Sequence, residues 1–153
     1  MTNRVVFCLG TAAVAALTAF SLPAVAAMAA TVDDIPAADS GLPSGVVKLG
    51  DSEQCPTKTL CLYRDYGRGG PAYGVGAGHP VDLNKLPIAG GTAGRPSAAN
   101  NISSWVNNTD HKAKLINIDA PGLTRTLKAG HSLEEPTATN DTVDKIEWAA
   151  GAK

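Results

Sequence analysis

Hydrophobic residues between positions 55 and 148 fall into short runs of three to six, separated by clusters of Gly, Pro, Asn and Asp. No window of twelve residues in this stretch keeps apolar side chains at the spacing of a helix face. Short runs bounded by turn-forming residues are typical of the strands of a sandwich or barrel, so the pattern predicts an all-β domain. The predicted strands are Thr59–Tyr63, Ala72–Val75, Val81–Leu83, Ser103–Val106, Lys114–Ile118, Thr124–Leu127 and Lys145–Trp148.

An internal repeat divides this domain into two halves. Ala77-Gly78-His79 recurs 52 positions later as Ala129-Gly130-His131, and Gly70 falls on Gly122 at the same offset. Each half then has an Asn- or Asp-rich turn before a strand that contains or ends on a Trp. One unit of about 45 residues is too small to bury a core alone. We therefore expect two four-stranded units that pack face to face.

The first 29 residues have the composition of a secretory signal peptide. Arg4 precedes the uncharged apolar run Val5–Leu22, and small residues up to Ala29 form the pattern that signal peptidase cleaves. We expect cleavage after Ala29, with Ala26 as the alternative site, and a secreted, extracellular protein that leaves the membrane. An uncleaved membrane anchor is the competing interpretation, because the apolar run approaches the length of a membrane span.

Residues 30–54 are expected to form a disordered N-terminal lead, either a linker or a short pro-segment. Asp, Pro, Gly and Ser interrupt every helical or strand period in this stretch. Only Val46–Leu49 has the composition of a weak edge strand. The expected division is a signal peptide at 1–29, the lead at 30–54 and one folded domain at 55–149.

Cys55 and Cys61 are the cysteines that remain after the signal peptide is removed. Two cysteines in an exported chain predict one disulfide, with two free thiols as the alternative. Loop-closure entropy gives such a short bridge about 2 kcal/mol of stability. The spacing excludes a C-x-x-C redox motif, and two cysteines are too few for a four-ligand zinc site.

Charge and motifs exclude two large classes of function. Removal of the signal peptide leaves 12 basic and 14 acidic residues without a basic run, so nucleic acid is not an expected partner. The motifs H-E-x-x-H, G-x-S-x-G and S-x-x-K are absent. The Gly-rich stretch 74–78 resembles a phosphate loop, but His79 replaces its last glycine and Pro80 follows where a helix would begin. We do not expect an enzyme, and His79 and His131 are predicted to be exposed turn residues.

Two motifs carry a resemblance to a known family. The first is Cys55-Pro56 with Leu60-Cys61-Leu62-Tyr63-Arg64-Asp65 and Gly69-Gly70, and the second is NISSWVNNT at residues 101–109. These residues resemble the βγ-crystallin double Greek key. More closely, they resemble the secreted bacterial peptidase-inhibitor family typified by the Streptomyces metalloproteinase inhibitor. The resemblance implies a double Greek key sandwich, a monomer, and a secreted peptidase as the partner, above all a metallopeptidase.

The first hairpin of a Greek key folds over, and a glycine with positive φ is needed at the fold. By the resemblance, Gly70 and Gly122 are these glycines. An aromatic side chain packs over the glycine in this family, and Tyr63 or Tyr66 is expected to do so at Gly70.

The resemblance also locates a reactive segment in the second half. The expected segment is Ile118, Asp119, Ala120, Pro121, Gly122 and Leu123. Since thermolysin-like enzymes favour a large aliphatic residue after the scissile bond, Gly122–Leu123 is the expected bond, although a hairpin role for Gly122 conflicts with this. An inhibitory loop is expected to be rigid and extended, because pre-organisation lowers the cost of binding. The loop Ile88–Ala98 is the alternative. A second disulfide braces the segment in the family's inhibitor, and this chain has no cysteines for one.

Calcium is the one cofactor that the sequence leaves open. Crystallin-type sites resemble the pattern [Asn/Asp]-[Asn/Asp]-x-x-[Ser/Thr]-Ser, whose oxygens suit Ca²⁺. The first half begins this pattern with Ala99, and the second half has Asp144 and Lys145 in place of the serines. Turns that begin strands without a metal are the alternative. The residues that would contribute to a weak site are Asn100, Asn101, Ser103, Asn140, Asp141 and Asp144.

Three functions fit this sequence, and a fold alone does not choose between them. The first is a non-enzymatic peptidase inhibitor that acts through a rigid, substrate-like loop. The second is a crystallin-type extracellular binding or structural module with weak calcium binding. The third is an antimicrobial protein of the killer-toxin-like kind.

Overall fold

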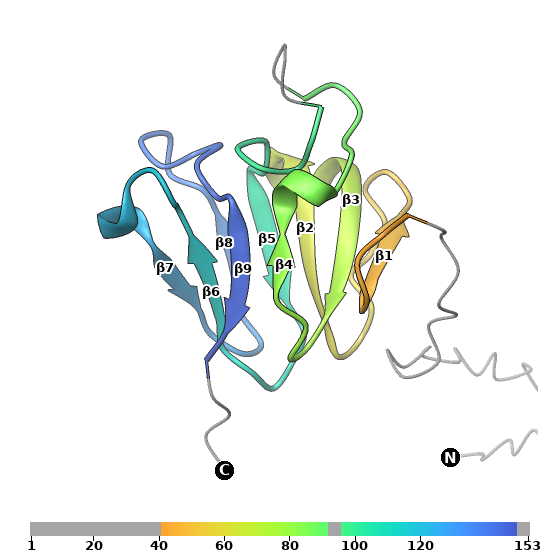
Figure 1. Ribbon diagram of the computed structural model, residues 1–153. Helices are drawn as coiled ribbons and strands as arrows, with labels where there is room; N and C mark the ends of the chain where they lie inside the picture. The colour runs from red at the N-terminus through yellow and green to blue at the C-terminus, as the bar shows by residue number, and fades with distance from the viewer. Residues whose placement is uncertain (1–40, 92–95, 150–153) are drawn as a thin grey trace, which may run out of the picture.

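Two antiparallel sheets packed face to face make up the described part of the chain (Figure 1). The computed structural model describes residues 41–91 and 96–149, so the expected signal peptide and residues 30–40 of the expected disordered lead lie outside the described residues. Nine strands and three short 3₁₀ turns are present in these residues, and the all-β prediction is confirmed. None of the helical turns in the described ranges is long and apolar enough to cross a membrane.

The first sheet has five strands in the order β1-β3-β2-β5-β8, and the second has four in the order β4-β9-β6-β7. The strands of the first sheet are β1 (Val46–Leu49), β3 (Gly69–Gly76), β2 (Thr59–Asp65), β5 (Ser104–Asn107) and β8 (Ser132–Glu134). Those of the second sheet are β4 (Val81–Asp82), β9 (Lys145–Trp148), β6 (Ala113–Ile116) and β7 (Arg125–Leu127).

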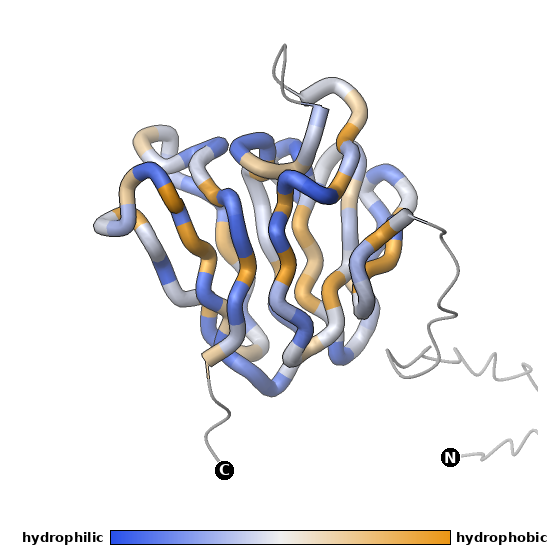
Figure 2. The backbone as a smooth tube through the Cα atoms, viewed as in Figure 1, coloured by the Kyte–Doolittle hydropathy of each residue, from blue (hydrophilic) through white to orange (hydrophobic). Residues whose placement is uncertain are grey.

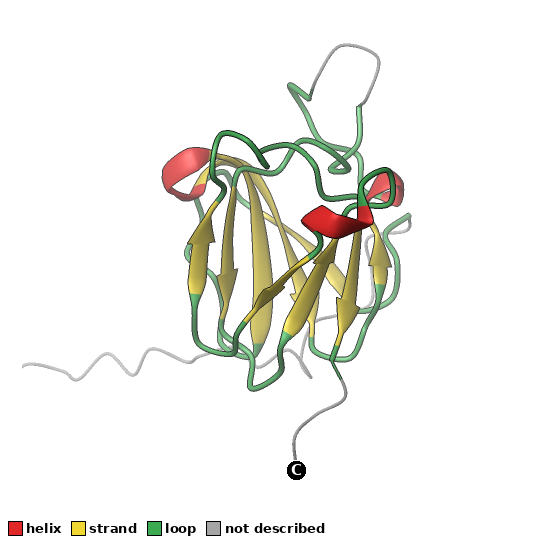
Figure 3. Cartoon of the chain, turned by 90° about the vertical axis from the view of Figure 1, so that its left-hand side faces the viewer, coloured by secondary structure: helices red, strands yellow, loops and turns green. Residues whose placement is uncertain are grey.

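Each half of the repeat contributes one strand to the sheet that contains the other strands of the opposite half. The first half supplies β2 to β5 and the second half β6 to β9, yet β4 pairs with β9 and β8 pairs with β5. This exchange of third strands is a double Greek key, as the sequence predicted. The loops β2–β3, β4–β5, β6–β7 and β8–β9 consequently gather at one end of the sandwich, where the 3₁₀ turns also lie (Figure 3).

Side chains alternate along β2 between two apolar clusters. Leu60 and Leu62 face the main core between the sheets, which is centred on the fully buried Trp105. Cys61 and Tyr63 face the other side of the sheet, where Leu49 of β1 packs on them in an outer cluster. Apolar positions accordingly follow the strands, while the loops at both ends of the sandwich are largely polar (Figure 2).

All seven predicted strands are present, and two further strands complete the first sheet. β8 escaped prediction because Leu133 is its only apolar residue and both neighbours are exposed. Val46–Leu49, expected as a weak strand within the lead, is β1, and both terminal residues of that strand are buried. The folded part of the chain therefore begins before Cys55.

The turns confirm the internal repeat at two places. Gly78 and Gly130 have φ values of +81° and +70°, and Asn100 and Asp141 have +57° and +53°. Glycine reaches this left-handed region without strain, and Asn and Asp reach it more readily than other residues. The two halves therefore use the same residue types at equivalent turns.

The expected folding corner differs from the structure. Gly70 has the expected positive φ of +68°, but the atoms nearest to the place of a Cβ there belong to Asp65 and Arg64, not to a tyrosine. Gly122 is not among the described glycines with positive φ, so its assignment as the second hairpin glycine is wrong. It lies in the 3₁₀ turn η4 (Pro121–Leu123), which Pro121 favours because its ring fixes φ near the helical value.

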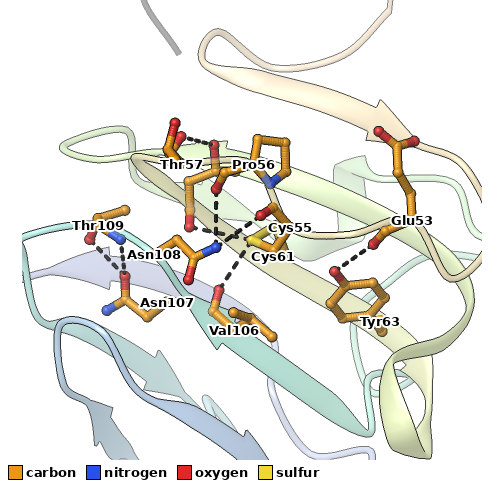
Figure 4. Close-up of a disulfide and its surroundings, with 11 residues drawn as sticks. Glu53, Cys55, Pro56, Thr57, Cys61, Tyr63, Val106, Asn107, Asn108 and Thr109 are labelled. Atoms are coloured by element: carbon orange, nitrogen blue, oxygen red, sulfur yellow. Dashed lines mark hydrogen bonds between the residues drawn. A yellow bond between two sulfur atoms is a disulfide. The ribbon is translucent and has the colours of Figure 1, made fainter. Parts of the chain in front are cut away.

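The predicted disulfide joins Cys55 to Cys61, with a Cα–Cα distance of 5.7 Å. Figure 4 shows the amide of Asn108 reaching this loop, where it donates to the carbonyls of Cys55 (2.9 Å) and Pro56 (3.3 Å). The side-chain amide of the neighbouring Asn107 donates to the carbonyls of His111 in the β5–β6 turn and of Leu127 and Lys128 where β7 leads into the β7–β8 turn. The paired asparagines of the NISSWVNNT motif thus have a structural role at the end of the sandwich opposite the 3₁₀ turns.

Replacing both bridge cysteines tests the energetic role of the disulfide. The double variant Cys55→Ala, Cys61→Ala is expected to lose about 2 kcal/mol of unfolding free energy, because the bridge restricts the unfolded chain. Urea denaturation of the oxidised wild type and the double variant measures the difference. A loss below about 0.5 kcal/mol would show that Asn108 holds the loop without the bridge.

Leu49→Ala tests whether β1 belongs to the cooperative fold. Leu49 is 6% exposed, so its truncation is expected to lower the free energy of unfolding by about 2–5 kcal/mol. Lys48→Ala on the same strand is the control and should change stability by less than about 0.5 kcal/mol, because Lys48 is exposed. Equal, small effects in urea denaturation would place β1 outside the folding unit.

Candidate functional site

The β6–β7 loop contains all six residues of the expected reactive segment. It leaves β6 at Ile116, forms η4 and enters β7 at Arg125, at the end of the sandwich where the 3₁₀ turns gather (Figure 1). Within η4 the Leu123 amide donates to the Ala120 carbonyl (2.9 Å), and the Thr124 amide donates to the Pro121 carbonyl (3.1 Å). The loop is therefore a short, internally bonded turn.

Two apolar side chains of this loop face solvent. Ile118 is 58% exposed and Leu123 is 39% exposed. Together with Tyr66 on the β2–β3 turn, they are the large hydrophobic side chains that are exposed in the described residues. Exposed apolar side chains on one loop are the kind of feature that anchors a protein contact.

Buried polar groups hold the start of the loop. The Asp144 carboxylate accepts a hydrogen bond from the Ile118 amide (2.8 Å) through one oxygen and from the Asn100 side chain (2.8 Å) through the other. The Asn117 side chain accepts from the Ala120 amide (2.6 Å). Asp144 and Asn117 are both buried, so these bonds are shielded from competing water.

A half-buried arginine, Arg125, holds the end of the loop. The Arg125 guanidinium donates to the Leu123 carbonyl (2.9 Å) and to the Thr139 carbonyl (3.0 Å) of the β8–β9 loop. It also forms an ion pair with Glu135, at 2.6 Å between Nη2 and Oε1, and the Glu135 side chain is fully buried. The same Glu135 oxygen accepts from Trp105 Nε1 (2.8 Å) in the core.

Sequence reasoning did not find Arg125 or Glu135. The pair is ten residues apart, with Arg125 in β7 of the second sheet and Glu135 just after β8 of the first, and no local motif contains both. The available signal was the second acid of the pair Glu134-Glu135, just after a strand of the second half. Such a residue has the same sequence appearance as any surface acid.

The structure differs from the expected extended backbone at the proposed scissile bond. Gly122–Leu123 lies inside the 3₁₀ turn, and the amide of Leu123 is already bonded within the loop. Because Gly122 is not a left-handed hairpin glycine, the conflict between its two expected roles disappears.

The alternative loop Ile88–Ala98 is buried at its ends. Ile88 is 4% exposed and Ala98 is fully buried, and their amides donate to the Pro96 and Leu86 carbonyls. Residues 92–95 lie outside the described part. Between this loop and the β6–β7 loop is a polar cleft of about 680 Å³, which Lys85, Ser97 and Asp119 help to line.

The six candidate calcium residues divide into separate groups. The side chains of Asn100 and Asp144 form a hydrogen bond with each other. The side-chain amide of Asn101 donates to the Ser97 and Ala99 carbonyls. Asp141 lies near Ser103 and Asp65 and accepts from the Asn140 side chain (3.0 Å). In the described residues no group of three or more His, Cys, Asp or Glu side chains is arranged to hold a metal ion.

Asp141 is the one candidate ligand with a perturbed carboxyl group. Burial raises its pKa and the nearby negative charge of Asp65 raises it further, while a hydrogen bond with Ser103 opposes both effects. Ionised Asp141 therefore destabilises the folded state at neutral pH. The cost disappears when the carboxyl is protonated in both the folded and the unfolded chain.

Asp141→Asn is expected to raise the melting temperature at pH 7, because it removes a partly desolvated charge near Asp65 and keeps a residue type that tolerates the left-handed turn. The sign follows from the raised pKa: the gain should be largest at neutral pH and should vanish below about pH 4, the usual range of an unfolded Asp. Thermal unfolding at several pH values, with the exposed Asp119→Asn as control, measures this. A gain independent of pH would contradict it.

Comparison with known proteins agrees with this architecture and identifies a family. A solved structure named "Evolution of the eye lens beta-gamma-crystallin domain fold" has a TM-score of 0.52 and 20% identity to this chain. The match covers 70% of this chain and 99% of the other, and it shows a shared fold. The class is therefore a βγ-crystallin-like double Greek key. None of the curated proteins compared with the chain matches it.

Residues 50–116 match the model of peptidase inhibitor family I36. The resemblance of the chain's motifs to that family is thereby confirmed. The match supports a non-enzymatic peptidase inhibitor with a peptidase as its partner. It ends at β6, immediately before the β6–β7 loop, so the loop itself is described by the structure alone.

Proposed function

We propose that the chain is secreted and inhibits a metallopeptidase by placing the β6–β7 loop in the active-site cleft of the enzyme. The observation that carries this proposal is the combination of two exposed apolar side chains, Ile118 and Leu123, with hydrogen bonds from anchored side chains at both ends of their loop. A loop that is already ordered avoids most of the entropy cost of binding. Leu123 would fill the pocket that receives the residue after the scissile bond.

The turn conformation supports slow cleavage after binding. Hydrolysis of the Gly122–Leu123 bond requires an extended backbone in the enzyme, whereas the Leu123 and Thr124 amides are bonded inside η4. Opening η4 would break both bonds and separate Leu123 from Arg125. The loop would thus bind through its side chains before its backbone reaches the geometry for cleavage.

The crystallin-type module with weak calcium binding is a second candidate. Its support is the proximity of Asp65, Ser103 and Asp141, which bring two carboxylates and a hydroxyl together at the loop end of the sandwich. For a killer-toxin-like antimicrobial activity, the described residues offer no separate support.

Titration of residues 30–153 against a thermolysin-like metallopeptidase, a subtilisin-like peptidase and a trypsin-like peptidase tests the proposal. Stoichiometric inhibition of the first enzyme alone is expected. Leu123→Asp should weaken it by about 30-fold or more, because an anchor of an interface contributes at least about 2 kcal/mol. Ser132→Asp adds the same charge to an exposed residue at the start of β8 and should leave inhibition unchanged.

Two results would overturn the proposal. One is the absence of inhibition of all three enzymes. The other is equal inhibition by wild type and Leu123→Asp, which would locate the contact elsewhere on the molecule.

A further inference from the structure

The end of the β6–β7 loop is fixed by a fully buried carboxylate. The Glu135 side chain has no exposed surface, and one of its oxygens takes bonds from Trp105 of the first sheet and from Arg125 of the second. Its other oxygen accepts from the Thr139 hydroxyl (3.3 Å). The core therefore fixes the position of Glu135, and Glu135 fixes the position of the guanidinium.

Arg125 connects the fixed carboxylate of Glu135 to two loops. One side of the guanidinium bonds to the Leu123 carbonyl of the β6–β7 loop, and the other bonds to the Thr139 carbonyl of the β8–β9 loop. The Thr142 hydroxyl lies 3.4 to 3.5 Å from the same group and donates to the Thr139 carbonyl (2.7 Å). A planar fork with five donors can satisfy these partners together, while a lysine ammonium cannot.

We infer that Arg125 and Glu135 are positioning residues for inhibition, forming a non-covalent brace that sets the place of Leu123. This inference rests on the proposed function of the β6–β7 loop. The brace acts where a second disulfide would otherwise be needed, in a chain whose only predicted bridge lies at the opposite end of the sandwich. The Glu135 side chain is fully buried and the Arg125 side chain is 18% exposed, so salt screens this ion pair less than a surface pair.

Arg125→Lys is the variant that separates positioning from folding. It keeps a positive charge beside Glu135 but removes the simultaneous bonds to the Leu123 and Thr139 carbonyls. Inhibition of the thermolysin-like enzyme should weaken by about tenfold or more, as expected for a lost hydrogen bond from a charged donor. Cleavage at Gly122–Leu123 should become faster, as followed by mass spectrometry. Glu135→Gln, which keeps an acceptor for Trp105, should act in the same direction.

Leu49→Ala is the matched control, because it destabilises the outer cluster of the first sheet. At a temperature where it remains folded, its inhibition constant should stay within about twofold of the wild type, although its stability falls. An equal loss of inhibition in Leu49→Ala and Arg125→Lys would overturn the inference, since both would then act through global stability. Unchanged inhibition and unchanged cleavage in Arg125→Lys would also overturn it.

Amide hydrogen exchange tests the brace without any peptidase. In Arg125→Lys the Leu123 and Thr124 amides should exchange about tenfold faster relative to those of β2, whereas Leu49→Ala should accelerate all protected amides alike. If the wild type inhibits none of the enzymes but this local acceleration is seen, the proposed function fails and the brace remains. If exchange rises uniformly in Arg125→Lys, the brace fails even when the wild type inhibits.

Discussion

The exchange of β4 and β8 between the two sheets is the constraint on which the rest of the structure depends. Neither half can complete its own sheet, because its third strand pairs with the other half. The halves therefore fold together, and loops that are far apart in the sequence meet at one end. The amide of Asn100 donates to the Val143 carbonyl there, and the Asp144 amide donates to the Ile116 carbonyl. First-half residues consequently support the β6–β7 loop indirectly, since Asn100 bonds to Asp144 and Trp105 bonds to Glu135.

A buried ion pair in this place is better understood as a positional device than as a source of stability. Desolvation of two charges offsets most of their attraction, so a buried pair adds little to stability compared with apolar residues of similar size. What an apolar replacement cannot do is bond to a carbonyl in each of two loops. Arg125 does this for Leu123 and Thr139. Trp105 keeps the partner carboxylate in place from the core.

The sequence was most informative where structure depends on neighbouring residues. Seven strands, the repeated turns around Gly78 and Gly130 and the disulfide follow from local composition, spacing or cysteine counting. The repeat offset wrongly predicted that Gly122 is a hairpin glycine like Gly70. The reason is that the β2–β3 and β6–β7 loops, although equivalent in the two halves, fold differently. The residues that hold the candidate loop were not predictable in this way. Arg125 and Glu135 are an ordinary base and an ordinary acid until the strand exchange brings them together.

The same reasoning explains why a covalent brace is not the only way to build a loop of this kind. A disulfide limits a loop mainly by restricting the unfolded chain, and its effect on the folded geometry is confined to the two residues that it joins. Here the restraint reaches backbone groups directly: the Ile118 amide at one end and the Leu123 carbonyl at the other. The apolar side chains between them need no further support, since η4 is closed by its own two hydrogen bonds. Because this loop is fixed through its backbone, its exposed side chains can be substituted without disturbing the fold. The specificity of the loop for a peptidase can therefore vary while the scaffold stays the same.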